Sequence, residues 1–311
     1  LLLIMKITVT CPRYFSEIKN LENNLNDKKY LVESFKPTGQ GFNAKEMMKN
    51  LENSQIAIIG DDEINDDVVS SCQNLELIIK WGVGIDNISI SNDFPTVLNT
   101  PSDIYIDVAE HVIYLIGSLL KDIPNIHKDL VTNGNWSKPT GSRLMGKNVG
   151  FIGYGKIARH TATLLNPFQV SQFFYDPYVE SADNLIAQKQ DMSFLQKTCD
   201  IFVVTTSLTK ETQHLLDKEF FNHLSKKPYI INVSRGQIIN EEDLIGALKN
   251  NLILGCALDV FEKEPISNTN GLKMFENIIF STHNASNTIE ANNSVNQQVT
   301  DTLLKWISEQ N

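Results

Sequence analysis

Short apolar runs alternate along the chain with segments whose apolar residues recur every three or four positions. Runs of β-branched and aliphatic residues are typical of buried strands, and the three-to-four spacing is typical of amphipathic helices. In the first third of the chain this pattern predicts strands at residues 6–10, 30–35, 56–60 and 76–80. Between these strands it predicts helices at residues 15–25, 43–52 and 66–72.

A second set of strands follows a long apolar helix that we expect from about Ser102 to Lys121. The predicted strands of this set lie at residues 148–153, 169–175, 200–205, 229–233, 254–260 and 277–282. A helix is predicted at 240–251, where Asn240 can cap an acidic first turn, and another at 289–307. Alternating strands and helices predict parallel sheets covered on both faces, so the fold class is α/β.

The two sets of strands predict two domains. We place the first at residues 1–98 and the second at residues 99–286. The last helix, at about 287–311, comes after the second set, and we expect it to return and complete the first domain.

Composition and charge narrow the class of partner. The chain has 311 residues, of which 41% are hydrophobic and 21% charged, which is typical of a globular protein. Its formal net charge of -10 disfavours a nucleic acid or an anionic membrane as partner, since both require clustered Lys and Arg. An anionic small substrate would have to be bound by local positive charge.

The cysteines and the apolar segments indicate a cytoplasmic protein. The four cysteines are far apart and form no metal-binding motif, so we expect reduced thiols and no metal site. The opening LLLIM is too short for a secretory signal, and Met5 is a candidate for the natural start. The longest apolar stretch, Val112 to Leu120, is much shorter than a bilayer span, so we expect no membrane partner.

A glycine-rich motif follows the strand predicted at 148–153. The segment VGFIGYGKIARHTA contains Gly153-x-Gly155-x-x-Ala158 between a strand and a helix, as in dinucleotide-binding folds. Asp176 comes 21 residues after Gly155 at the end of the next predicted strand, where an acid can bind a ribose 2′-hydroxyl. An acid there repels a 2′-phosphate, which favours NAD over NADP. A plain strand–turn–helix with glycines used for packing is the structural alternative.

The segment IINVSRGQII places Arg235 at the end of a predicted buried strand. A guanidinium at that position either forms an ordinary ion pair or binds an anionic ligand.

From about residue 75 to 286 the chain resembles the D-isomer-specific 2-hydroxyacid dehydrogenases. The matching segments, in order, are KWGVGIDNI, LNTPS, DVAEHVI, NGNW, GKNVGFIGYGKIA, SLTKETQHLLD, INVSRGQIINEEDLIGAL and ALDVFEKEP. The resemblance implies two Rossmann-like domains, one flavodoxin-like and one NAD-binding, with the active site in the cleft between them. It also implies a homodimer, and we expect the helix at 102–121 to pack against its mate.

By this resemblance, the family's catalytic residues fall on Arg235, Glu264 and His283. Oxidation of a 2-hydroxy acid requires loss of the hydroxyl proton as a hydride leaves the same carbon. A histidine near its neutral pKa suits the proton step, and Glu264 would orient the ring. Arg235 would bind the substrate carboxylate and the developing carbonyl oxygen. Each residue taken singly also has an ordinary structural explanation, and only their co-occurrence favours catalysis.

The resemblance assigns further residues to ligand binding. Backbone amides of the WGVG segment would bind the substrate carboxylate at Gly82, Val83 and Gly84. Asp259 would bond the nicotinamide carboxamide. Beyond Gly153, Gly155 and Asp176, the cofactor would be contacted by Tyr154, Lys156, Ile157, Thr205, Thr206, Ser207, Thr212, Val233 and Ser234.

The sequence departs from the family pattern beside the cofactor and the histidine. Ser207 stands where proline is usual, and Thr205 where histidine is frequent. Thr282 replaces the proline before the histidine and removes a rigid support, and Asn284 adds a polar group beside the nicotinamide.

These observations favour an NAD-dependent dehydrogenase acting on a D-2-hydroxy acid, or reducing the matching 2-oxo acid. Phosphoglycerate, glyoxylate or hydroxypyruvate, and D-lactate-type substrates stay open, although the acidic segment IGDDEIN disfavours a phosphate. Formate dehydrogenases of this fold usually have glutamine at the position of Glu264, which argues against that activity. An NAD-sensing binding protein of the same fold, without turnover, is the alternative from another class.

Overall fold

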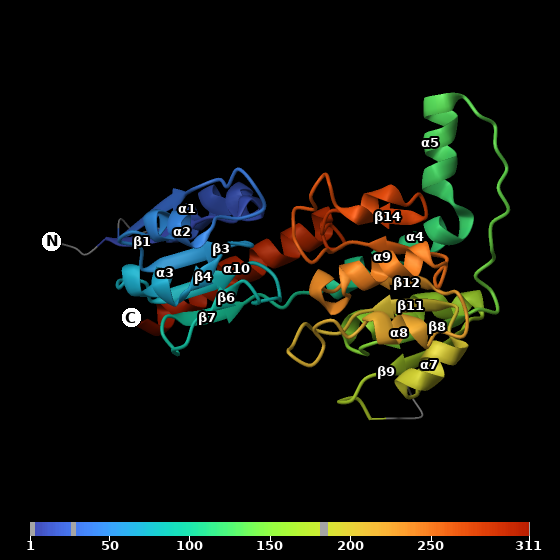
Figure 1. The fold of residues 1–311 in the computed structure, drawn as a ribbon. Helices are drawn as coiled ribbons and strands as arrows, with labels where there is room; N and C mark the ends of the chain where they lie inside the picture. Colours follow the sequence, from blue (N-terminus) through green and yellow to red (C-terminus); the bar gives the residue numbers. More distant parts are fainter. Residues whose placement is uncertain (1–3, 26–28, 181–185, 311) are drawn as a thin grey trace. The chain divides into compact units, whose positions relative to one another are not determined.

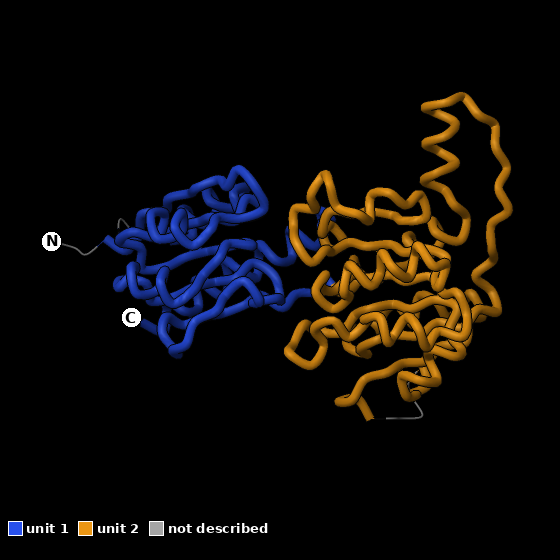
Figure 2. Tube along the Cα trace, in the orientation of Figure 1, with its two compact units in different colours: residues 1–104, 287–311 blue, residues 105–286 orange. Residues whose placement is uncertain are grey.

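The computed structural model describes residues 4–25, 29–180 and 186–310. The chain forms two compact units, shown in different colours in Figure 2. Unit 1 contains Leu1–Ile104 and Asn287–Asn311, and unit 2 contains Tyr105–Ser286. The first boundary thus follows Ile104, where the sequence suggested residue 98, and the chain returns to unit 1 after Ser286.

Unit 1 is built on a five-stranded parallel sheet with strand order β2-β1-β3-β5-β7. These strands are β1 (Met5–Val9), β2 (Tyr30–Ser34), β3 (Ile56–Ile59), β5 (Leu77–Lys80) and β7 (Thr96–Asn99). A two-stranded pair, β4 (Ile64–Asn65) and β6 (Ile88–Ser89), lies outside the sheet. The helices are η1 (Pro12–Glu17), α1 (Ile18–Leu25), α2 (Ala44–Asn50), α3 (Asp66–Ser71) and α10 (Ile289–Gln310).

Alternation along the central strands divides the core of unit 1 into two layers. On β3, Ile56 and Ile58 pack with Leu21 of α1 and Val299 of α10, whereas the residues between them face the opposite layer. That second layer contains Met47 of α2 and Val68 of α3. Because both faces are covered, β3 and β5 are fully buried and read as continuous apolar runs.

Unit 2 is built on a seven-stranded parallel sheet with strand order β10-β9-β8-β11-β12-β13-β14. Its strands are β8 (Asn148–Ile152), β9 (Ser171–Tyr175), β10 (Gln188–Lys189), β11 (Ile201–Val204), β12 (Tyr229–Asn232), β13 (Gly255–Leu258) and β14 (Ile278–Phe280). Its α-helices are α4 (Tyr105–Lys121), α5 (Ile123–Asn133), α6 (Lys156–Leu165), α7 (Met192–Thr198), α8 (Lys218–Asn222) and α9 (Glu241–Lys249). Three short 3-10 helices complete it: η2 (Asn166–Phe168), η3 (Gly236–Ile238) and η4 (Gly271–Met274).

The sheet of unit 2 is also covered on both faces. One core layer joins α4 and α6 to alternate residues of the central strands, and the other joins α7, α8 and α9 to the residues between them. The predicted α/β class with parallel sheets is therefore confirmed.

Helix α5 differs from the other α-helices of unit 2 because it buries none of its residues. Figure 1 shows it standing out from the rest of the unit, with an extended segment returning from its end towards β8. Among the described residues, no helix is long and apolar enough to cross a membrane.

All four cysteines are buried, and none forms a disulfide. Burial raises the pKa of the Cys11 thiol to about 11 and that of Cys199 to about 12. These thiols therefore stay protonated at neutral pH.

Candidate active site

The predicted site residues of unit 2 follow the carboxyl ends of neighbouring strands. Because all strands of this sheet are parallel, their carboxyl ends lie along one edge, which is where open α/β sheets bind ligands. From one side of the sheet to the other, this edge carries Asp176 after β9, Gly153 after β8, Thr205 after β11, Arg235 after β12, Asp259 after β13 and His283 after β14.

The glycine turn after β8 uses its two glycines in different ways. Gly153 has φ +88°, and an added Cβ would lie 2.6 Å from backbone atoms of Thr206, so only glycine fits. Gly155 has open space where its Cβ would be. That space allows a ligand to approach the backbone closely, as a pyrophosphate does in dinucleotide-binding folds.

Helix α6, which begins directly after Gly155, has no side-chain cap at its N-terminus. By contrast, Asn or Asp side chains cap α2, α3, α7, α8 and α9. The amides at the start of α6, including those of Lys156 and Ile157, thus have no side-chain acceptor. Uncapped amides and the positive end of the helix dipole fit the pyrophosphate of NAD.

Asp176 connects the end of β9 to the glycine turn. Its Oδ2 accepts a hydrogen bond from the Tyr154 amide at 2.8 Å, and its Oδ1 accepts from the Tyr178 amide at 2.9 Å. The Tyr154 side chain is buried, where it stacks on Phe174 and its hydroxyl accepts from the Ala187 amide. The structure therefore gives Tyr154 a supporting position beneath the turn.

The threonines predicted beside the cofactor lie in the segment after β11. Thr205 donates through Oγ1 to the Gly153 carbonyl at 2.9 Å, and Ser234 Oγ donates to the carbonyl of Thr206. Thr212 Oγ1 donates to the Ser207 carbonyl at 2.7 Å. These contacts fix this segment against the glycine turn and against the loop that carries Arg235.

His283 and Glu264 form a close pair in the structure. Nδ1 of His283 lies 2.8 Å from Oε2 of Glu264, and Oε1 of Glu264 accepts a hydrogen bond from the Phe261 amide at 2.9 Å. Both side chains are partly exposed. A carboxylate bound to Nδ1 fixes the ring orientation and tautomer, and it stabilises the protonated ring.

Asp259 holds the segment that carries His283. Its backbone carbonyl accepts from the His283 amide at 2.7 Å, and its carboxylate accepts from the amides of Asn284 at 2.8 Å and Ala285 at 3.0 Å. His111 of α4 lies with Nε2 3.9 Å from Asp259 Oδ1, and burial lowers the pKa of this imidazole although the Asp259 carboxylate opposes the shift. The contacts of Asp259 with the His283 segment and with His111 were not predicted from the sequence. The only sequence signal for the second contact is that His111 lies in DVAEHVI, one of the segments that match the family.

The loop that carries Arg235 packs tightly against the loop that carries Glu264. An added Cβ at Gly236 would lie 1.8 Å from the carbonyl carbon of Phe261, so the two loops meet backbone to backbone. Asn232 donates to the Arg235 carbonyl at 2.9 Å, and the Arg235 guanidinium donates through Nη1 to the Ser234 carbonyl at 2.8 Å. Val233 is buried below this loop.

In unit 1, carbonyl groups of the predicted carboxylate-binding segment, Gly82 to Gly84, accept hydrogen bonds from other residues of the unit. The Thr100 amide donates to the Gly82 carbonyl at 3.0 Å, and the Asn99 side chain donates to the Val83 carbonyl at 2.8 Å. Gly82 has φ +97°, and its amide donates to Thr100 Oγ1. Within the described part of the chain, the amides of Val83 and Gly84 have no hydrogen-bond partner. Two successive free amides can bind an anion.

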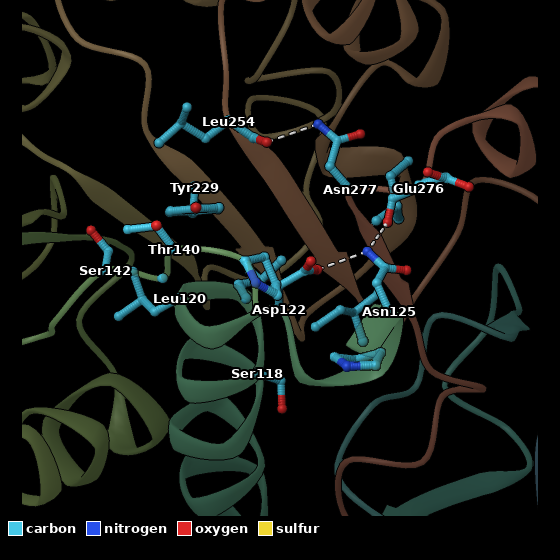
Figure 3. Close-up of a pocket in the computed structure, with 16 residues that line it drawn as sticks. Ser118, Leu120, Asp122, Asn125, Thr140, Ser142, Tyr229, Leu254, Glu276 and Asn277 are labelled. Atoms are coloured by element: carbon cyan, nitrogen blue, oxygen red, sulfur yellow. Dashed lines mark hydrogen bonds between the residues drawn. The ribbon is translucent and has the colours of Figure 1, made fainter. Parts of the chain in front are cut away.

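A pocket of about 550 Å³ lies at the opposite, amino-terminal edge of the sheet of unit 2. Figure 3 shows Tyr229, Leu254 and Asn277 at the starts of the strands, with Asp122 and Asn125 facing them. No predicted site residue lines this pocket. In addition, no group of three His, Cys, Asp or Glu side chains in the described ranges could hold a metal ion.

Comparison with known proteins agrees with the geometry. Residues 113–285 match the NAD-binding domain of the D-isomer specific 2-hydroxyacid dehydrogenases. The chain is 34% identical over 262 residues to glyoxylate reductase of Thermofilum pendens, covering 79% of this chain and 76% of that protein. It is 33% identical over 251 residues to D-3-phosphoglycerate dehydrogenase of Bacillus subtilis, covering 78% of this chain but only 47% of that protein.

The fold has close counterparts among solved structures. The apo-structure of D-lactate dehydrogenase from Escherichia coli matches with a TM-score of 0.82 and 25% identity, covering 98% of each chain. The resemblance inferred from the motifs is thereby confirmed. This chain belongs to the family of D-isomer specific 2-hydroxyacid dehydrogenases, and its unit 2 contains the family's NAD-binding domain.

Proposed function

We propose that this protein transfers a hydride between NAD and a small D-2-hydroxy acid with an uncharged tail, or reduces the corresponding 2-oxo acid. The observation that carries the proposal is the 2.8 Å contact between His283 and Glu264, on the sheet edge that also presents the glycine turn. An acid–base pair beside a nucleotide-binding turn is the minimum that this reaction requires.

Bound NAD supplies the hydride acceptor, and the protein supplies proton transfer and charge stabilisation. Because Nδ1 of His283 is held by Glu264, Nε2 is the nitrogen that takes the hydroxyl proton. When the substrate loses its hydride to bound NAD, His283 would take the O–H proton, so that the product is a carbonyl compound. Glu264 stabilises the imidazolium that results. In reduction, the same imidazolium returns the proton to the new hydroxyl.

A positively charged side chain and two backbone amides are the groups that would bind the carboxylate of the substrate. Arg235 is assigned to the carboxylate and to the developing carbonyl oxygen, since a guanidinium offers paired donors. The free amides of Val83 and Gly84 are assigned to the carboxylate as well. The hydrogen bonds of this loop support the assignment, because its carbonyls are already bonded within unit 1 while these two amides have no partner among the described residues.

The charge of unit 1 supports a substrate with an uncharged tail. The segment after β3 carries Asp61, Asp62 and Glu63, and the lysine at the end of β5, Lys80, is already paired with Asp61. Asp62 is buried, but a phosphate near this segment would meet the exposed acids Asp61 and Glu63, and the Arg13 guanidinium is stacked on the Trp81 ring at 4.7 Å. Glyoxylate and hydroxypyruvate fit better than phosphohydroxypyruvate, and the printed name of the Thermofilum relative agrees with this choice.

A substrate panel tests the proposal directly. Glyoxylate, hydroxypyruvate, pyruvate and phosphohydroxypyruvate are offered with NADH, and NADH oxidation is followed at 340 nm. We expect turnover with the uncharged-tail acids and at least about tenfold lower kcat/KM with the phosphorylated acid. Preference for the phosphorylated acid would reject the proposed substrate class. Absence of turnover with every acid, despite NADH binding, would favour the NAD-sensing protein.

We also propose that the protein forms a homodimer through α4, α5 and the segment after α5. Val131 and Trp136 are 71% and 79% exposed, and Tyr114 of α4 is exposed as well. Large exposed apolar side chains gathered on one part of a unit are typical of an interaction surface, and α5 buries none of its residues.

A further inference from the structure

A buried lysine lies directly beneath the loop that we assign to the substrate carboxylate. The side chain of Lys80, the last residue of β5, is 7% exposed. Its ammonium group donates to the Trp81 carbonyl at 3.0 Å and to Asp61 Oδ1 at 3.3 Å. Asp61, by contrast, is 44% exposed at the end of β3.

The contact with Trp81 completes the orientation of the loop. Three successive carbonyls, those of Trp81, Gly82 and Val83, each accept a hydrogen bond. The donors are the Lys80 ammonium, the Thr100 amide and the Asn99 side chain. The Lys80 carbonyl is itself bonded by Thr100 Oγ1 at 3.1 Å. With these carbonyls already hydrogen-bonded within unit 1, the amides of Val83 and Gly84 are available to an external anion.

The charge of Lys80 acts on the same anion. A largely buried ammonium is poorly screened by water, so its field extends to neighbouring groups more strongly than that of a surface lysine. Asp61 neutralises part of this field but is itself well solvated, and it does not contact the loop carbonyl.

We propose that Lys80 is a positioning residue for the anion-binding loop, and that Asp61 limits how strongly this loop attracts a carboxylate. The inference rests on the proposed function, because it takes the amides of Val83 and Gly84 as the carboxylate site. Lys80 would strengthen the binding of a monocarboxylate and Asp61 would weaken it, so that the product can still dissociate.

Two substitutions separate this role from ordinary structural support, because they should act with opposite signs. Lys80→Met removes the donor to Trp81 and the positive charge, so carboxylate affinity should fall about tenfold. Asp61→Asn keeps Lys80 and its contact with Trp81 but removes the neutralising charge, so affinity should rise about threefold. A pair that only stabilises the fold would give weaker binding in both variants.

The chain offers a matched control pair in the same unit. Lys6 and Glu33 form an ion pair at 2.9 Å on β1 and β2, with side-chain exposures of 20% and 41%. Lys6 also bonds a backbone carbonyl, that of Glu52, at 3.1 Å. Lys6→Met and Glu33→Gln should therefore leave carboxylate affinity unchanged.

The test uses oxamate, an unreactive monocarboxylate, bound to the full chain saturated with NADH. The Kd of oxamate is measured from NADH fluorescence, and the Kd of NADH and the thermal midpoint are measured alongside. We expect the Kd of oxamate to rise in Lys80→Met and to fall in Asp61→Asn, with the Kd of NADH unchanged in both.

Weaker oxamate binding in Asp61→Asn, or equal shifts in the control pair, would overturn the inference. No oxamate binding by the unaltered protein would overturn it as well. Turnover of the substrate panel is a separate measurement, so the proposed function can stand if the inference about Lys80 fails. Because Asp61 is well exposed, Asp61→Asn keeps the test decisive even if Lys80→Met does not fold.

Discussion

His283 has a backbone conformation that few side chains adopt. Its φ of +53° lies in the left-handed region, which is uncommon outside glycine, although asparagine, aspartate and histidine enter it more often than other residues. Asp259 holds this conformation by bonding the amides of three consecutive residues, 283 to 285. The backbone of this segment is thereby fixed without the proline that the family usually has before the histidine.

His283→Asn tests the acid–base role without disturbing this backbone, because asparagine tolerates the left-handed region. We expect turnover to fall by roughly 10² to 10⁴-fold, the range typical of a lost acid–base group. The Kd of NADH should change by less than about twofold, since the glycine turn and α6 are untouched. Steady-state kinetics and NADH fluorescence provide the two measurements. A parallel loss of NADH affinity would show that the residue acts structurally.

Asp176 has two roles, in cofactor choice and in stability, and Asp176→Ser should affect both. In Asp176→Ser the repulsion of a 2′-phosphate is lost, so the ratio of NAD to NADP efficiency should fall by about tenfold. The Tyr154 amide also loses its acceptor, which should destabilise the fold by about 1 kcal/mol. Asp191→Ala, which removes the side-chain N-cap of α7 in the same unit and should also cost about 1 kcal/mol, serves as a control for stability alone. An unaltered cofactor ratio would remove Asp176 from the cofactor site.

At the scale of elements, the turn between β8 and α6 provides a matched pair of glycines. Gly153→Ala forces a Cβ to 2.6 Å from Thr206 at a positive φ, so it should destabilise the protein by about 1–3 kcal/mol. Gly155→Ala meets no atom within 4 Å, so stability should change by no more than about 0.5 kcal/mol. Yet its Cβ enters the space assigned to the pyrophosphate, and NADH affinity should fall by about tenfold. Urea unfolding and NADH titration check the two effects, and unchanged NADH affinity in Gly155→Ala would contradict the assignment.

The elements that the sequence predicted are those with strong apolar runs. All ten predicted strands form, because their apolar residues contribute to the core layers on the two faces of each sheet. The short strand β7 was missed because it follows Pro95 and lies at the sheet edge, where half its residues are exposed. Helices α7 and α8 were also missed, although Asp191 and Asp217 cap them and could have indicated their starts.

The candidate site was predictable where a residue type alone implies chemistry. The sequence alone shows the glycines after one strand, the acid after the next strand and the histidine after a later strand. The clamp of Asp259 on residues 283–285 and the pair of Lys80 with Asp61 join residues from different strands. Such pairings depend on strand order, which local periodicity does not determine.

At the scale of the whole molecule, the chain forms most of unit 1, then all of unit 2, and finally returns to unit 1. Helix α10 restores unit 1, where Asn296 accepts a hydrogen bond from the Trp81 indole at 2.8 Å and Thr300 contacts Tyr14 at 2.6 Å. These contacts bury polar groups of the last helix among residues of the first hundred. Unit 1 therefore needs both ends of the chain for its core.

The proposed homodimer rests on the apolar side chains that unit 2 leaves exposed. An 11-residue helix with no buried side chain gains little stability from its own chain, so α5 requires contacts from elsewhere. We expect sedimentation equilibrium at micromolar concentration to give twice the mass of one 35.0 kDa chain. Val131→Ser with Trp136→Ser removes two of the most exposed apolar groups and should shift this mass towards that of one chain. Tyr178→Ser, at an 88% exposed aromatic away from α5, should leave the dimer intact, whereas a monomeric unaltered protein would refute the dimer.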